Sequence, residues 1–384
     1  MNRYGTKALL GVTLLGLSWL AQAADWQEVG HVHDVAASAH GATFVAGHNG
    51  VFRIEDGIPV RVSSAHASSI AVLDTRLLLA GLDHDGKPGP LRAANLSEGI
   101  AHAQVHGPDS RTLAVVAGPD AELYAVAGRT LFFSGDSGQS WQRRGALPNK
   151  MIDLAAADTD SLLYAATYSG LMVSRDGGRR WQVEKAMPTP ATSVAVRGDR
   201  LEVFQYKRGL QQGTRREVSD VPVSNDFGQQ VPVRMVFAGQ NELYATTNWG
   251  HLFMSTDGGE RWSRVDRLGA DTLSTAARRG KAIYQQDCVS CHGTDGVGEA
   301  PRLGELETGL APALDETMHA WHHTDENLAT IIRDGTSGRM PGWGSALSDG
   351  QIGDLVAYIK SLWDERALRC QGPAHMSRAC QQPR

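Results

Sequence analysis

Residues 288–292 have the sequence Cys-Val-Ser-Cys-His, a set of residue types and spacings that can do metal chemistry. Two cysteines three positions apart lie on the same side of a helical turn, so both thiols can add to the two vinyl groups of one porphyrin. The next residue, His292, is then placed to bind the iron. C-x-x-C-H is the attachment pattern of c-type haem, and it predicts one haem per chain with Cys288 and Cys291 as its thioether anchors.

Two other uses of this pattern are a thiol redox pair and half of a zinc site. A thioredoxin-like pair belongs in a βαβ setting, and a zinc site requires a second Cys or His pair at matching spacing. The sequence has neither context. Haem attachment is therefore the interpretation that the sequence favours.

Two segments that flank the motif have the pattern of amphipathic helices. Residues 274–286 begin with a serine cap, and residues 348–363 also begin with one. The second segment spaces its apolar residues at helical intervals: Ile352, Leu355, Val356, Ile359 and Leu362. Between the two segments lie a glycine-rich loop that ends in Pro301 and the sequence Arg-Met340-Pro-Gly-Trp.

Helix, C-x-x-C-H, glycine loop, Met-Pro and final helix, in that order, resemble the class I c-type cytochromes. The resemblance implies an all-α cytochrome c domain over residues 274–363, with His292 as the proximal and Met340 as the distal iron ligand. It also implies that the Pro301 carbonyl accepts the second ring N–H of His292, a bond that fixes the tautomer of a metal-binding imidazole.

Three histidines compete with Met340 for the distal position. A lone methionine is more often core filler than a ligand, and His319, His322 and His323 would give bis-histidine ligation. We prefer Met340, because it lies where the cytochrome pattern requires its sixth ligand. The three histidines are then a polar loop and helix start near the haem edge.

The region from Asp25 to Asp266 is repetitive. The pattern S-x-D-x-G-x-x-W occurs at 134–141, 174–181 and 255–262. Its Ser, Asp and Gly favour a tight turn in which the Asp side chain binds nearby backbone N–H groups, and its Trp can pack between neighbouring units. The pattern resembles the Asp-box of sialidase-type β-propellers.

Apolar positions in the strand before each hairpin recur about every 40 residues. They are Val35, Ile70, Leu113, Leu154, Val194 and Met235. Together with Val/Tyr/Phe-rich strands and Gly-Asp turns, they predict an all-β six-bladed propeller over residues 24–266. We expect Trp26–Val29, which resembles the strand after a box, to pair with the last blade and close the ring.

Asp-boxes indicate an architecture and not an activity. A sialidase needs an arginine cluster, a tyrosine nucleophile and carboxylates, and no such set is evident in the sequence. Glycoside hydrolysis is therefore not expected.

Histidines cluster in the first two blades. His31 and His33 lie two positions apart on the first inner strand and hence on one face. His48 lies on the hairpin partner of that strand. In the second blade, His66 is the equivalent of His31, and His84 lies near the following hairpin. Because inner strands line a propeller's channel, these side chains are candidate ligands for copper or zinc. The alternative is a polar, water-filled channel mouth. These segments also resemble exported propellers related to photosystem assembly factors.

The two ends of the chain point to export. Residues 1–23 have a basic start, an apolar run and an Ala-Gln-Ala site, which predict a cleaved secretory signal peptide. No other stretch is apolar and long enough to span a bilayer, so the expected location is the periplasm. In that oxidising compartment, Cys370 and Cys380 of the tail (364–384) are expected to form a disulfide, and unpaired thiols are the alternative.

Composition and organisation together indicate the class of function. The formal net charge of −5 argues against nucleic acid as a partner. With a short linker at 267–273, we expect a periplasmic electron-transfer protein that meets redox partner proteins and uses its propeller as a docking platform. The alternatives are a two-centre oxidoreductase, with a substrate or copper site in the propeller, and an assembly or scaffold protein.

Overall fold

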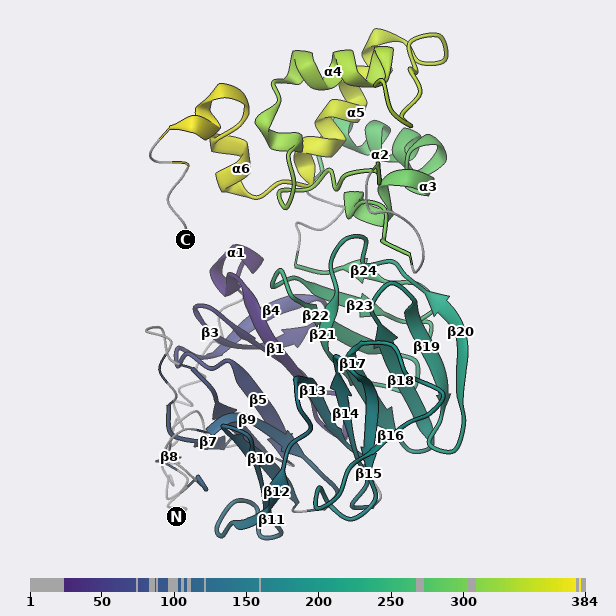
Figure 1. Cartoon of the computed structure of the whole chain (residues 1–384). Coiled ribbons are helices and arrows are strands. Elements are labelled where there is room, and N and C mark those ends of the chain that lie inside the picture. The colour runs from purple at the N-terminus through teal and green to yellow at the C-terminus, as the bar shows by residue number, and fades with distance from the viewer. Residues whose placement is uncertain are drawn as a thin grey trace, which may run out of the picture.

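The computed structural model describes residues 24–73, 75–82, 87, 89–95, 103–104, 107–108, 112–120, 122–158, 160–266, 273–302, 309–377 and 380. The predicted signal peptide and all of the linker except Leu273 lie outside the described residues. The N-terminal part is a ring of β-sheets, and a helical domain stands on one face of that ring (Figure 1). The prediction of an all-β propeller followed by an all-α domain is confirmed.

Six four-stranded sheets, here called blades 1 to 6, make up the ring. Blades 1 to 3 comprise β1 (Val32–Ala37), β2 (Thr43–Gly47), β3 (Gly50–Glu55) and β4 (Ile58–Ser63); β5 (Ser69–Leu73), β6 (Arg76–Ala80), β7 (Arg92–Asn95) and β8 (Ala103–Gln104); and β9 (Thr112–Ala117), β10 (Leu123–Ala127), β11 (Thr130–Ser134) and β12 (Gln142–Ala146). Blades 4 to 6 comprise β13 (Met151–Ala156), β14 (Leu163–Thr167), β15 (Gly170–Ser174) and β16 (Gln182–Val183); β17 (Ala191–Arg197), β18 (Arg200–Gln205), β19 (Gly209–Thr214) and β20 (Val218–Ser224); and β21 (Pro232–Phe237), β22 (Leu243–Thr247), β23 (Leu252–Ser255) and β24 (Ser263–Arg264).

Within each blade, strands adjacent in sequence pair antiparallel, and the first strand lies innermost. The second strands β2, β10, β14 and β22 are buried along their whole length, because neighbouring blades cover both of their faces. This explains why these strands have apolar runs such as Leu-Tyr-Ala in place of a strict apolar–polar alternation.

The three S-x-D-x-G-x-x-W segments fold into one shared turn. In the first, the Ser134 hydroxyl donates to Asp136 Oδ1 (2.7 Å) and accepts from the Gly138 amide (2.8 Å), and the Ser140 amide donates to the same carboxylate oxygen (2.8 Å). These bonds, led by the one from the Ser140 side chain, lower the pKa of Asp136 to about 2. Equivalent bonds form in the other two segments, so the predicted turn chemistry is confirmed.

The prediction that Trp26–Val29 forms a closing strand is wrong. These residues form a short helix, α1 (Trp26–Val29), because the Asp25 side chain caps it by accepting from the Gln27 amide (3.2 Å). The Trp26 indole donates to the Gly57 carbonyl at 3.2 Å, which holds α1 to blade 1. Blade 6 takes all four of its strands from its own segment, β21 to β24.

The ring closes instead by packing the start of blade 1 on blade 6. The Val32 amide, at the start of β1, donates to the Gly250 carbonyl (2.9 Å) in the turn between β22 and β23. Val32 and Val35 share one core cluster with Tyr244 and Leu252 of blade 6. Closure therefore rests on apolar burial between complete blades.

A buried arginine joins the inner strands across the channel. Arg234 of blade 6 pairs with Asp153 of blade 4 (Nη1–Oδ1, 3.0 Å) and with Asp34 of blade 1 (Nε–Oδ1, 3.3 Å). Each aspartate also accepts a hydrogen bond from a backbone amide of the next blade. Asp34 accepts from Ile70 of blade 2 (2.8 Å), and Asp153 accepts from Val194 of blade 5 (3.0 Å). One cation thus links five blades, and its buried charge is balanced by both carboxylates.

The helical domain consists of short helices. They are α2 (Thr275–Asp287), α3 (Val289–His292), η2 (Thr294–Gly296), η3 (Ala320–His322), α4 (Asp325–Asp334), α5 (Asp349–Ser361), α6 (Glu365–Arg369) and η4 (Gly372–Met376). The two predicted amphipathic helices are α2 and α5, and Ser274 and Ser348 cap them as expected.

Helices α2 and α5 cross closely at Gly280. A Cβ there would lie 2.0 Å from the Asp354 carbonyl oxygen, so only glycine permits the approach. Beside the crossing, the rings of Tyr284 and Tyr358 pack with centroids 5.1 Å apart. At the C-terminal end Cys370 and Cys380 form the predicted disulfide. Among the described residues, no helix has the length and apolar character needed to cross a membrane.

Candidate functional site

The C-x-x-C-H motif lies where α2 ends and α3 begins. The Cys288 amide still bonds to the Tyr284 carbonyl of α2 (2.9 Å), while the amides of Cys291 and His292 both donate to the Cys288 carbonyl (3.2 and 2.9 Å). This tight turn leaves Cys288 half-buried, Cys291 exposed and both thiols free. Both sulfur atoms are therefore available for attachment.

The environment of Cys288 argues against a thiol redox pair. Redox-active C-x-x-C motifs depend on a lowered cysteine pKa, because the thiolate is the reactive form. Burial, reinforced by the charge of Asp287, instead raises the pKa of Cys288 to about 11. At neutral pH this thiol stays protonated, which fits an anchor better than a redox nucleophile.

His292 is buried and held in one orientation. Its Nδ1 donates to the Pro312 carbonyl at 2.9 Å, which leaves Nε2 as the nitrogen that can bind a metal. Burial lowers the pKa of His292, so the neutral imidazole required of a metal ligand is favoured. These are the properties expected of a proximal haem ligand.

The carbonyl that orients His292 is not that of Pro301, so this prediction is corrected. After His292 the chain turns, and the Gly298 amide donates back to the His292 carbonyl (2.7 Å). The Glu299 amide then pairs with the Ala311 carbonyl (2.9 Å), which brings Pro312 beside the imidazole. Pro301 comes two residues after Glu299, and the carbonyl bonded to His292 Nδ1 is that of Pro312.

Met340 lies half-buried in a compact loop between α4 and α5. Its carbonyl accepts the Thr336 amide (3.1 Å), and the Trp343 amide donates to the Ile332 carbonyl of α4 (3.0 Å). The loop is tight enough that a Cβ at Gly335 would lie 2.7 Å from the Met340 carbonyl oxygen. Met340 packs on the same helical core as Cys288.

The three competing histidines occupy the side of the domain that carries the tail. His319 and His323 are exposed, and His322 stacks on His375 of η4 with ring centroids 4.2 Å apart. The His323 carbonyl accepts from the Gln371 side chain (3.0 Å). The ring of His322 thus packs against the tail, and the backbone of His323 is bonded to it.

The donor set and its surroundings fit a covalent haem. Several apolar side chains pack on the helical core while staying only partly buried: Val289, Leu314, Trp321, Ala329, Met340, Trp343 and Leu347. The same domain carries two free thiols, the His292 imidazole with Nδ1 bonded to Pro312, and the thioether of Met340. A flat, mainly apolar macrocycle would cover this surface and use each of those donors.

The loop after the motif docks on the propeller. Val297 is 1% exposed, because it inserts into a cluster with Phe227, Phe253 and Trp262 of blades 5 and 6. Its carbonyl accepts the Gln229 amide at 3.4 Å. The cytochrome-like motif is thus anchored to the propeller within a few residues of His292.

A buried charge cluster forms the second interdomain contact. Arg264 of β24 pairs with Asp266 (Nε–Oδ1, 2.7 Å) and, across the interface, with Glu316 (Nη2–Oε1, 2.8 Å) and Asp315 (Nη1–Oδ2, 3.5 Å). His251 of blade 6 also approaches Glu316, with 3.5 Å between Nε2 and Oε1. The two domains are therefore fixed relative to each other by apolar and charged contacts.

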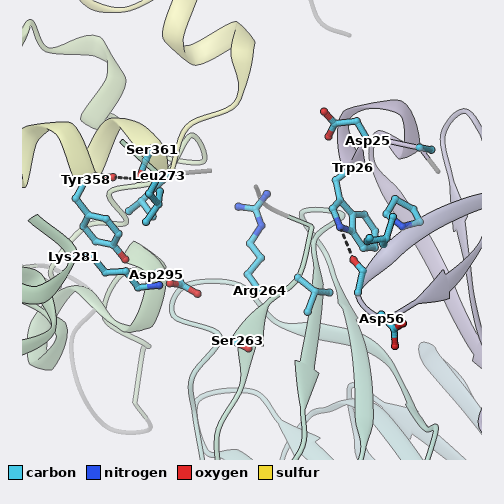
Figure 2. Close-up of a pocket in the computed structure, with 16 residues that line it drawn as sticks. Asp25, Trp26, Asp56, Ser263, Arg264, Leu273, Lys281, Asp295, Tyr358 and Ser361 are labelled. Carbon is cyan, nitrogen blue, oxygen red and sulfur yellow. Dashed lines mark hydrogen bonds between the residues drawn. The ribbon is translucent and has the colours of Figure 1, made fainter. Parts of the chain in front are cut away.

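On the side of α1, a cleft of about 670 Å³ separates the two domains. Trp26 and Arg264 line it from the propeller, and Lys281, Asp295 and Tyr358 line it from the helical domain (Figure 2). The contacts made by Val297 and by Glu316 lie on blades 5 and 6, at Phe227, Phe253, Trp262 and Arg264.

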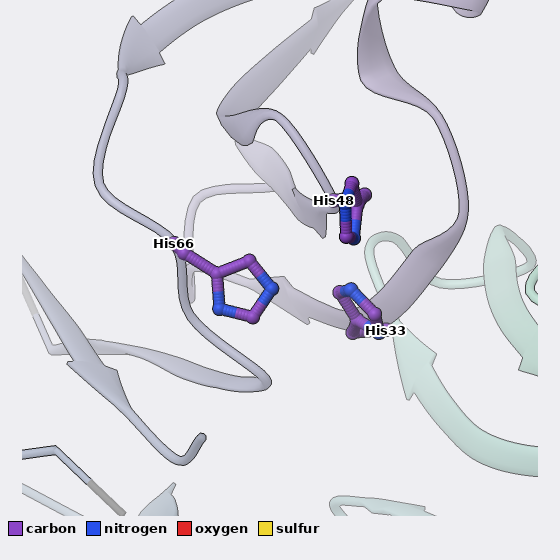
Figure 3. A group of neighbouring side chains, drawn as sticks. All are labelled: His33, His48 and His66. Atoms are coloured by element: carbon purple, nitrogen blue, oxygen red, sulfur yellow. The ribbon is translucent and has the colours of Figure 1, made fainter. Parts of the chain in front are cut away.

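Three of the four predicted histidines of the propeller converge. One nitrogen from each of His33, His48 and His66 lies within 4.8 Å of the other two (Figure 3). His31 adjoins the group, with its ring centroid 5.0 Å from that of His33, but it does not join it, because Gly250 of blade 6 packs against its ring. His84 lies outside the described residues.

Comparisons with known proteins concern mainly the helical domain. The profile of the family "Cytochrome C oxidase, cbb3-type, subunit III" matches residues 275–359. The chain is 33% identical over 91 residues to the cbb3-type cytochrome c oxidase subunit CcoP of Azospirillum brasilense, a match that covers 24% of this chain and 30% of that subunit. It is 35% identical over 94 residues to cytochrome c-555 of Chlorobaculum tepidum, which covers 24% of this chain and 82% of that cytochrome.

The propeller has only distant neighbours among these solved structures. The structure titled "YCF48 bound to D1 peptide" covers 65% of this chain and 86% of its own, with a TM-score of 0.44 and 13% identity. A virginiamycin B lyase from Staphylococcus aureus gives a TM-score of 0.43 at 14% identity. The assignment of the fold as a six-bladed propeller therefore rests on the six four-stranded sheets of this chain.

Proposed function

The chain belongs to the c-type cytochromes through its C-terminal domain, and we propose that it is a periplasmic electron carrier whose propeller serves as a docking platform. The observation that carries this proposal is the His292 imidazole, whose Nδ1 is bonded to Pro312 and whose Nε2 is left for iron beside two free cysteines. A haem attached there supplies a one-electron Fe(II)/Fe(III) couple.

Each residue of the site has a defined part in this function. Cys288 and Cys291 would hold the macrocycle through thioether bonds, and His292 would bind the iron as its proximal ligand. The Pro312 carbonyl orients the imidazole and raises its strength as a donor, and burial favours the neutral form by lowering the pKa of His292. Met340 is the distal ligand, held by the loop between α4 and α5.

The fixed interface supports the role of the propeller. Val297 and Glu316 lie on either side of the segment that positions His292, and both are bound by propeller residues. A partner protein that binds the propeller is therefore held at a defined position relative to the haem. This geometry favours a docking platform over a flexibly tethered second domain.

Export is supported by two features of the chain. The N-terminal 23 residues have the composition of a signal peptide, and Cys370 and Cys380 are joined in a disulfide, which is stable in an oxidising compartment.

The proposal is tested by producing the full chain in a bacterium with periplasmic haem-attachment machinery. We expect a haem that remains on the protein in a denaturing gel, one iron per chain, and reversible one-electron reduction. The variant Cys288→Ser with Cys291→Ser should lose the covalent haem, whereas Cys370→Ser with Cys380→Ser should keep it. A chain that matures without covalent haem would overturn the proposal.

A further inference from the structure

The propeller carries three imidazoles that the electron-transfer function does not use. His33 belongs to β1, His48 follows β2 in the turn to β3, and His66 precedes β5. Their ring centroids lie 6.1 Å (His33–His48), 5.2 Å (His33–His66) and 5.7 Å (His48–His66) apart. Three separate segments therefore direct the same kind of side chain at one point, as Figure 3 shows.

The spacing suits one metal ion. Metal–nitrogen bonds of about 2.0 Å at a tetrahedral angle place two ligand nitrogens about 3.3 Å apart. The nitrogens of this group all lie within 4.8 Å of one another. His48 is exposed, so its ring has room to turn toward the other two.

A second observation comes from His66. Its Nδ1 donates to the Leu82 carbonyl at 2.7 Å, an arrangement in which Nε2 is the nitrogen that can bind a metal. Metal-binding histidines usually make such a bond with the other ring nitrogen, because it fixes the tautomer and strengthens the donor. The same arrangement holds His292 on the Pro312 carbonyl.

The backbone around His48 is also fixed. The His48 amide donates to the His31 carbonyl (2.8 Å), which joins the start of β1 to the turn after β2. Gly30, with φ +68°, packs against the His48 Cβ, and a side chain at that position would be strained and would crowd His48. The turn that carries His48 is thus held beside the strand that carries His33.

The group lies on the face of the propeller that carries the cytochrome domain. His31, two residues before His33, packs on Gly250, and the next residue, His251, approaches Glu316 of the cytochrome domain. The opposite mouth of the channel, lined by residues such as Ala37, Ser38 and Pro119, is distant from these contacts, because it lies at the other end of the inner strands.

We propose that His33, His48 and His66 bind one copper ion. Three neutral imidazoles without a thiolate or carboxylate are a ligand set for copper or zinc, and the same donors bind Cu(II) more tightly than Zn(II). Three protein ligands leave a further coordination position for an exogenous ligand. The site lies on the face that carries the cytochrome domain, which transfers single electrons, and this favours copper, which is redox-active, over zinc, which is not. This site does not depend on the haem function and extends beyond it.

The test uses the full-length, haem-loaded protein. The protein is incubated with one equivalent per chain each of Cu(II) and Zn(II), desalted, and its copper, zinc and iron are counted by mass spectrometry. We expect one copper per iron and an electron paramagnetic resonance spectrum with nitrogen hyperfine structure. The single variants His33→Ala, His48→Asn and His66→Ala should each weaken copper binding by about 10-fold or more.

His40→Ala is the matched control, because His40 is an exposed histidine of the same blade outside the group. It should retain copper, and all variants should retain the haem spectrum and the wild-type melting temperature. His48→Asn keeps the test valid if a substitution at the less exposed His33 or His66 disturbs folding. Preferential retention of zinc, or copper retention by the triple variant equal to that of the wild type, would overturn the proposal.

Discussion

Glu316 of the cytochrome domain and Arg264 of the propeller form an ion pair, with 2.8 Å between Oε1 and Nη2. The segment that carries Glu316 also contains Pro312, whose carbonyl orients His292, and Leu314, whose carbonyl accepts the Trp363 indole N–H at 2.8 Å. The segment that orients His292 is therefore the same short segment that docks on the propeller.

Removal of Arg264 should uncouple the domains. In Arg264→Met, the carboxylates of Asp266, Asp315 and Glu316 stay in place without their cation, and loss of one partner of a buried ion pair costs about 3–5 kcal/mol. We expect the calorimetric unfolding transition to split or to shift clearly downward. Arg369→Met, which removes an exposed pair with Glu365, should cost less than about 1 kcal/mol. Equal effects of the two variants would show that the charge cluster does not hold the interface.

Gly228 should be specifically required for docking. Its φ is +60°, and a Cβ would lie 2.1 Å from the Val297 carbonyl oxygen. Gly198 has nearly the same φ, +57°, but a Cβ there would meet nothing within 4 Å. Gly198→Ala therefore reports backbone strain alone, about 1–2 kcal/mol. Gly228→Ala should lower the melting temperature further and expose the linker to protease. If both variants melt alike and resist protease alike, the contact with Val297 is not important.

Met340 should determine the spectrum and potential of the oxidised haem. We expect Met340→Ala to keep the covalent haem, lose the weak red absorption band of Met–Fe(III) ligation and lower the reduction potential. Met376→Ala, at a methionine that is 66% exposed in the tail, serves as control and should change neither. An unchanged spectrum in Met340→Ala would point to His319, His322 or His323 as the ligand.

The buried carboxyl of Glu202 should make stability depend on pH. Glu202 is 1% exposed, and burial raises its pKa from 4.5 to about 7, despite the ion pair with Arg200 (2.9 Å). Between these two values the folded state binds the proton more tightly than the unfolded chain does. Stability should therefore fall as the pH rises from 4.5 to about 7, by up to about 3 kcal/mol, and the contribution of the neutral carboxyl is lost above that window.

Urea unfolding at several pH values between 4.5 and 8 measures this slope. Glu202→Gln should flatten it, because the amide does not titrate. Glu217→Gln, on the exposed loop before β20, is the control and should leave the slope unchanged. A slope that persists in Glu202→Gln would assign it to another group.

The disulfide should fix the tail against the cytochrome domain. Cys370 and Cys380 close a short loop, and such a cross-link contributes about 3 kcal/mol through the unfolded chain. Cys370→Ser with Cys380→Ser should lower the unfolding free energy by that order and loosen the stack of His322 on His375. The haem spectrum should remain unchanged, and treatment of the wild type with reductant should reproduce the loss. A spectral change would mean that the tail contacts the haem site directly.

Local chemistry accounts for what the sequence predicted correctly. The C-x-x-C-H motif, the caps at Ser274 and Ser348 and the S-x-D-x-G turns depend on residues a few positions apart. The six blades follow from a repeat of similar short strands, and each repeat forms its own sheet. Such features need no knowledge of distant partners.

The wrong predictions involved distant or competing contacts. Pro312 replaces Pro301 because the Glu299 amide pairs with Ala311, a contact that no local pattern encodes. His31 stays out of the histidine group because Gly250 of blade 6, which is distant in sequence but adjacent in space, packs on its imidazole. A closing strand was expected because Trp26–Val29 resembles the segments that follow the Asp-boxes. The Asp25 side chain, which caps these residues, was the signal that indicated a helix.

The sequence by itself determined the two domains, the C-x-x-C-H motif proposed to bind haem, and the histidines near the start of the propeller, because residue type and short-range spacing carry that information. Only the tertiary structure decided that Arg264 and Val297 lock the domains together, and which three histidines meet. These relationships depend on how closed sheets and packed helices bring segments that are distant in sequence within a few ångströms of one another.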